Sequence, residues 1–147
     1  MIFQNDAILI ILGIVIGTLI LFLALYVAEL YIISKSTARA RKLPTLAAAF
    51  LGVLIVPLLA QGAAIVFGAI GDLMAAWQHP LGIAPRNYLM ILVPVIAYLL
   101  FWVICKFLID TTWEKSGWVA LVGILLLYLI YTIFPMIPQN LPFTIPV

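Results

Sequence analysis

The stretch LYVAELYIISKSTARARKLP, Leu25 to Pro44, ends an apolar run with a carboxylate and then places four basic residues within eight positions. Such a change from apolar to basic residues is typical of the point where a transmembrane helix leaves the bilayer on its cytoplasmic side. Glu29 lies at this change. Its depth in a bilayer depends on where the apolar runs of the whole chain begin and end.

The composition decides the class of protein. Hydrophobic residues make up 67% of the 147 residues and charged residues 8%, and the mean hydropathy is +1.33. A hydrocarbon core about 30 Å thick needs about 20 apolar residues per helix, and the sequence contains four such runs. We therefore predict an all-α integral membrane protein, a four-transmembrane-helix bundle in one domain over residues 1–147. The helices are expected at 7–33, 45–70, 88–109 and 112–134, with an extended Pro-rich tail at 135–147.

The basic residues predict the orientation. Six of the seven Lys and Arg residues lie in the break between the first and second runs or flank the break between the third and fourth. The positive-inside rule makes that side cytoplasmic, so both termini are expected outside the cell membrane and loop 34–44 inside. Because MIFQND has no positive region, the first run is expected to stay in the mature protein. Four loop cations are expected to contact anionic lipid at about 1 kcal/mol each: Lys35, Arg39, Arg41 and Lys42.

Small residues repeat along two of the predicted helices. At about 100° per residue, the members of the first stripe fall on one helix face, where another helix is expected to approach closely. The first stripe contains Gly13, Gly17, Ala24 and Ala28. A second ridge in the next helix contains Ala60, Ala64 and Gly68.

Glu29 is expected at the edge of the bilayer. It lies 22 residues after Ala7, which is about 33 Å along a helix and close to the full hydrocarbon thickness. It also points about 130° away from the centre of the first small-residue stripe. We interpret it as a carboxylate at the inner interface that pairs with a lysine or with water, and a proton- or cation-handling site remains the alternative.

Two helices contain an interior proline. Pro57 is expected to kink the second helix, and Gln61 one turn later is expected to bond to a freed carbonyl or to another helix. Pro94 lies in the third helix, followed by Tyr98. If the protein is a channel or carrier, its pathway is expected near these four residues, with Glu29 as a further polar group.

The breaks between helices are interpreted structurally. Residues 72–78 are expected to form an interfacial half-helix, and Asp72, Met74 and His79 match no spacing of metal ligands, so no metal site is predicted. Lys106 and Asp110 are expected to pair one turn apart. Thr111 with Glu114 fits a capping box that opens the fourth helix.

The end of the chain, FPMIPQNLPFTIPV, carries four prolines and no charge. An uncharged apolar strand is a poor solvated tail, so this segment is expected to lie along another protein surface. The alternative is that it rests on the outer loop of its own chain or among lipid headgroups. The partner-contact residues are expected to be Met136, Ile137, Leu141, Phe143 and Ile145.

No residue pattern indicates an enzyme. The single histidine has no nucleophile beside it, no nucleotide motif occurs, and no basic surface suits nucleic acid. No cofactor is predicted, and a bound lipid or quinone is left open. Small multidrug transporters and fluoride channels also have four helices in a similar length. This sequence departs from them, because Glu29 lies at the membrane edge and not near the middle of its helix, and because the charge bias between the two sides is strong. We therefore expect a non-catalytic accessory or structural subunit that packs against other membrane protein subunits, and the alternative is a small self-assembling channel or secondary transporter.

Overall fold

The computed structural model describes residues 2–77 and 87–133. Within these ranges nearly every residue is helical and no strand occurs. The elements are α1 (Ile2–Ile32), α2 (Lys35–Ala40), α3 (Lys42–Ala76), the 3-10 helix η2 (Tyr88–Ile91), α4 (Leu92–Ile109) and α5 (Trp113–Ile133). Four segments are long and apolar enough to cross a membrane: Ala7–Ile32, Lys42–Ala76, Tyr88–Ile109 and Trp113–Ile130. The prediction of an all-α protein with four transmembrane helices is confirmed.

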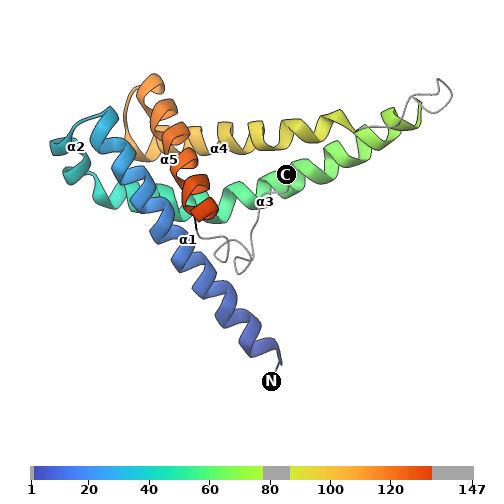
Figure 1. The fold of residues 1–147 in the computed structure, drawn as a ribbon, viewed down its shortest axis with the longest axis horizontal. Coiled ribbons are helices and arrows are strands. Elements are labelled where there is room, and N and C mark those ends of the chain that lie inside the picture. The colour runs from blue at the N-terminus through green and yellow to red at the C-terminus, as the bar shows by residue number, and fades with distance from the viewer. Residues whose placement is uncertain (1, 78–86, 134–147) are drawn as a thin grey trace.

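Each of the four long helices packs mainly against two of the others. α1 packs against α3 and α5, and α4 packs against the same two helices. α3 and α4 run side by side, while the N-terminal half of α1 points away from them (Figure 1). All four long helices meet at the end of the molecule that carries α2 and the α4–α5 turn, and they diverge from there (Figure 1). We call this end the basic end, formed by residues 33–42 and 106–115.

The core lies where the four helices meet, and small residues make it possible. Ala28, Ala48 and Ala49 are fully buried there. A Cβ atom on Gly52 would lie 2.6 Å from ring atom Cε2 of Phe101. Real Cβ atoms do not come so close, so a glycine is needed for α3 to approach the Phe101 ring. Glycine thus sets the distance between α3 and α4.

The basic connection contains a helix that the sequence analysis did not predict. Ser34 begins α2, because its Oγ accepts a hydrogen bond from the backbone nitrogen of Thr37 at 3.2 Å. α3 then begins at Lys42, three residues earlier than predicted. Pro44 is compatible with this start because backbone donors in the first helical turn have no acceptor within the helix.

The predicted half-helix at 72–78 was wrong as a separate element. α3 continues without a break through Ala76, and no proline interrupts it near Asp72. The helix also runs through Pro57, and Figure 1 shows that it changes direction along its length. Asn87 joins this end of α3 to η2: its Nδ2 donates to the carbonyl oxygen of Gly68 at 3.1 Å, and its Oδ1 accepts from the nitrogen of Leu89 at 3.2 Å.

The turn between α4 and α5 also differs from the prediction. Asp110 ends α4 in the left-handed conformation, with a φ of 52°. α5 therefore begins at Trp113, and the cap is Thr112, whose Oγ1 accepts from the nitrogen of Lys115 at 3.4 Å. The predicted cap, Thr111, lies one residue too early for a helix that starts there.

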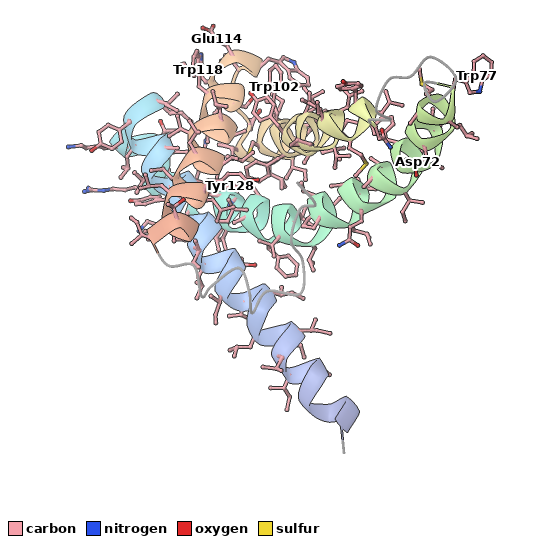
Figure 2. The ribbon with its side chains drawn as sticks, turned by 45° about the vertical axis from the view of Figure 1, so that its right-hand side comes forward. Asp72, Trp77, Trp102, Glu114, Trp118 and Tyr128 are labelled. Carbon is pink, nitrogen blue, oxygen red and sulfur yellow. The ribbon has the colours of Figure 1, made fainter. Side chains whose placement is uncertain are left out.

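Polar and aromatic side chains mark the ends of the spans. Figure 2 shows Asp72 and Trp77 at the far end of α3, and Glu114 and Trp118 near the beginning of α5. Both tryptophans are exposed. Tryptophan is enriched where a membrane meets water, so these positions are typical of the two interfaces of a bilayer.

Candidate functional site

Arg41 joins the two halves of the basic end. Its Nη1 donates to the carbonyl oxygen of Asp110 at 2.6 Å and also to that of Ile109. The last carbonyls of a helix have no partner within the helix and carry the negative end of its dipole. A guanidinium group has both the donors and the charge to satisfy them. Arg41 therefore caps α4 from the connection between α2 and α3.

A recess opens beside this cap, with a volume of about 450 Å³. Lys106 does not pair with Asp110 as predicted; its Nζ donates to the carbonyl oxygen of Thr111 at 2.6 Å, because the left-handed Asp110 turns this carbonyl toward the lysine. Three cations, one each from the α2–α3 connection, α4 and α5, share this recess with the hydroxyl groups of threonines. Its lining consists of Ile33, Thr37, Arg41, Lys106, Asp110, Thr111, Thr112 and Lys115.

The cations predicted to contact lipid are not equivalent in the structure. Lys35, Arg39 and Lys42 are exposed, whereas Arg41 is partly buried and bonded to α4. Lys42 also lies 5.9 Å from the centre of the Tyr26 ring. The sequence alone did not show that Lys106 and Lys115 lie beside Arg41. These lysines approach Arg41 only when the α4–α5 turn folds against the α2–α3 connection.

Glu29 is fully buried, which corrects the prediction of a carboxylate facing the interface. Thr45 is also fully buried, and its Oγ1 lies 2.7 Å from Oε1 of Glu29. No lysine pairs with Glu29 in the described part of the chain. Oε2 is buried without a hydrogen-bond partner. Glu29 is buried although it points away from the small-residue stripe, because α1 packs against both α3 and α5 and so buries two faces, of which the stripe marks only one.

The small-residue positions are mostly inside the molecule. The first stripe, Gly13, Gly17, Ala24 and Ala28, is buried. In the second ridge Ala60 is fully buried and Ala64 is partly buried, but a Cβ atom on Gly68 would meet nothing within 4 Å. Sequence spacing did not single out four glycines at which an added Cβ atom would come within 3 Å of a neighbouring side chain. These are Gly52 against Phe101, Gly71 against Asn87, Gly117 against Trp102 and Gly123 against Leu25.

The residues of the predicted polar pathway have different surroundings. Gln61 is exposed, and its amide makes no hydrogen bond to any residue of 2–77 or 87–133, so the predicted bond to a freed carbonyl is absent there. Pro57 is buried and Pro94 is partly buried. Tyr98 donates from its hydroxyl to the carbonyl oxygen of Gly117 at 3.2 Å and stacks on Trp102. None of the four lines the recess at the basic end.

Some predicted positions lie outside the described residues. His79 and the partner-contact residues Met136, Ile137, Leu141, Phe143 and Ile145 are among them. Within 2–77 and 87–133, no three His, Cys, Asp or Glu side chains come together as a metal site would require. Comparisons of the chain with protein-family models, with curated proteins and with solved structures found no match. The structure defines the class: an all-helical protein whose four apolar helices fit a multi-pass membrane protein.

Proposed function

We propose that this protein is a non-catalytic accessory or structural subunit of a larger membrane protein complex. The observation that carries the proposal is the surface of α3 on which Gln61 lies. Gln61 is exposed although it stands within a candidate span, between apolar residues on both sides. An amide that faces hydrocarbon loses its hydrogen bonds to water, so such a side chain is favoured where another protein supplies partners.

The residues around Gln61 support a helix as the partner. We define the outer face of α3 as Leu58, Gln61, Gly62, Ile65 and Ala69, all of which are exposed. A Cβ atom on Gly62 would meet nothing within 4 Å, so packing within this chain gives no reason for a glycine there. Glycine in a helix interior costs about 1 kcal/mol relative to alanine, and in membrane helices small residues lie where a second helix approaches closely. The partner is therefore a membrane subunit with a hydrogen-bonding side chain opposite Gln61.

Anionic lipid is the second partner in this proposal. The basic end, with its recess, supplies Lys106 and Lys115 in addition to Lys35, Arg39 and Lys42, and cations at a cytoplasmic membrane surface attract acidic headgroups. This assignment places loop 34–44 in the cytoplasm and both termini outside. The apolar tail at 135–147 adds a second contact to the partner subunit in this proposal.

A second candidate function is a small self-assembling channel or secondary transporter. The exposure of Gln61 also favours it, because a polar side chain within a span faces the interior of a bundle or a water-filled path when several copies assemble. The outer face of α3 would then meet a second copy instead of a different polypeptide. The identity of the chain bound to this face separates the two functions.

The test is a change that fills the outer face without touching the core. Gly62→Leu adds a side chain where the structure has open space, so the protein is expected to fold. Co-purification of different polypeptides with the tagged protein from its own membrane is expected to fall about tenfold, equivalent to about 1.4 kcal/mol. The matched control is Val103→Leu, which enlarges an exposed side chain of α4 and is expected to leave the yield unchanged. Equal yields from both variants would argue against this face as the contact.

A further inference from the structure

Glu29 differs from the other acidic residues whose burial the structure describes. Asp72, Asp110 and Glu114 are exposed, whereas Glu29 has no accessible surface. Its carboxyl group lies beside the connection that leads from α2 into α3, because Thr45 is one helical turn after Arg41. The contacts of this carboxyl group determine whether it carries a proton.

Thr45 has more acceptors than it has protons. Its Oγ1 lies 2.7 Å from Oε1 of Glu29 and 2.8 Å from the carbonyl oxygen of Arg41. A threonine hydroxyl group has a single proton, and a backbone carbonyl only accepts. One hydroxyl proton can be shared between two acceptors in a bifurcated bond, whereas a separate proton for each contact gives two full hydrogen bonds. When the hydroxyl donates to the carbonyl of Arg41, a proton on the carboxyl group of Glu29 gives the second contact its own hydrogen bond.

The charges around Glu29 support the same assignment. The nearest guanidinium, that of Arg41, donates to the carbonyl oxygens of Ile109 and Asp110, and no cation forms an ion pair with Glu29 in the described ranges. From α4 the facing titratable group is Cys105, which is also fully buried. The charged residues of α2 and of the start of α5 are exposed: Lys35, Arg39, Glu114 and Lys115. An unpaired buried carboxylate costs far more free energy than a neutral acid that donates one hydrogen bond.

We propose that Glu29 is a proton-binding site. In the folded protein at pH 7 it is a neutral carboxylic acid that donates from Oε1 to Oγ1 of Thr45, and this proton holds α1 against the start of α3. Ile33 and Arg41 line the recess and lie one turn from Glu29 and Thr45, respectively. We expect the proton to exchange with water through this recess. This assignment does not depend on whether the chain has a partner subunit.

Loss of the proton would change two contacts. The hydroxyl of Thr45 would turn from the carbonyl of Arg41 to the new carboxylate, which only accepts. The carboxylate would also attract the guanidinium of Arg41, which caps α4 in the protonated state. Proton binding at Glu29 therefore links the contact between α1 and α3 to the turn between α4 and α5.

Infrared spectroscopy of the full chain in lipid vesicles tests the proposal, with the spectrum of each variant subtracted from that of the wild type. At pH 7 the wild type is expected to show the carbonyl stretch of a protonated carboxylic acid, shifted in heavy water, and Glu29→Gln is expected to lack it. The control is Glu114→Gln, which removes an exposed carboxylate and is expected to leave the band in place. A wild type without such a band, or a band that persists in Glu29→Gln, would overturn the proposal.

A second variant guards against a folding defect in Glu29→Gln. Thr45→Val removes the acceptor of the acid proton and keeps the shape of the side chain. The band is expected to move to higher wavenumber in this variant, because the carbonyl stretch of an acid whose O–H donates a hydrogen bond lies lower than that of a free acid. A band that stays in place in Thr45→Val would contradict the donation from Glu29 to Thr45.

Discussion

Arg41 illustrates how one residue of the basic loop differs from its neighbours. By sequence it is one of four cations expected to contact lipid, but its guanidinium bonds to the last carbonyls of α4. Lys35, Arg39 and Lys42, close by in the chain, are exposed. The difference arises from the short helix α2, which ends at Ala40 and leaves Arg41 directed at the end of α4. The chain positions of these residues do not reveal such a direction.

Arg41→Ala is expected to lower the free energy of unfolding by about 2 kcal/mol, because hydrogen bonds from a charged group to helix-terminal carbonyls are lost and the carbonyls are left without partners. Denaturation in detergent micelles measures the effect. Arg39→Ala removes an exposed cation two residues away and is expected to change stability by less than about 0.5 kcal/mol. Equal effects of the two changes would show that the cap on α4 does not contribute.

Gly52→Ala is expected to destabilise the protein by about 1–3 kcal/mol, because the new Cβ would lie 2.6 Å from the buried Phe101 ring. The same change at Gly62 adds a Cβ in open space and is expected to be neutral or to stabilise by up to about 1 kcal/mol. Thermal unfolding of the two variants in the same detergent makes the comparison. A Gly62→Ala variant that loses as much stability as Gly52→Ala would contradict the packing described for α3.

At the scale of elements, hydropathy predicts the spans, and local contacts decide their ends. Apolar runs longer than a bilayer thickness predicted all four long helices, since the bilayer imposes helix on any such run. The ends were missed where a single contact extends or stops a helix. Asp110 in the left-handed conformation shifts the start of α5, and α3 continues beyond the predicted end near Ile70 because nothing in its sequence interrupts the backbone hydrogen bonds.

The join between α3 and η2 depends on the absence of a side chain at Gly71, because Asn87 occupies the space where a Cβ would lie. Gly71→Ala is expected to displace Asn87 from the carbonyl of Gly68 and to lower stability by about 1–3 kcal/mol. Chemical denaturation in micelles provides the measurement. Gly68→Ala is the matched control, since its Cβ meets nothing within 4 Å. Identical losses in the two variants would contradict this role of Gly71.

In the molecule as a whole, the charge distribution predicts the orientation in the membrane, whereas the packing of the helices decides which side chains are buried. The distribution of Lys and Arg predicts an orientation without a folded structure, because insertion follows the charges of short loops. The burial of Glu29 was not predictable in this way, because it depends on α1 having helices on two sides. The exposure of Gln61 likewise depends on the face that α3 turns away from α1 and α4. The sequence therefore singled out Glu29 and Gln61 but did not predict their surroundings.

The proposed orientation predicts which cysteines a membrane-impermeant maleimide modifies in whole cells. In a Cys105→Ser background, Lys35→Cys is expected to react only after the cells are permeabilised, because the proposed orientation has loop 34–44 in the cytoplasm. Gln4→Cys, near the opposite end of α1, is expected to react in intact cells. The reverse pattern would show that the protein is inserted with its basic end outside.

We propose that this protein works bound to other membrane subunits. Native mass spectrometry of the protein, extracted gently from its own membrane, tests it most directly. We expect one or more different polypeptides in stoichiometric amounts with the wild type, and their loss from the Gly62→Leu variant. A wild type found as a monomer, or as an oligomer of this chain alone, would contradict the claim.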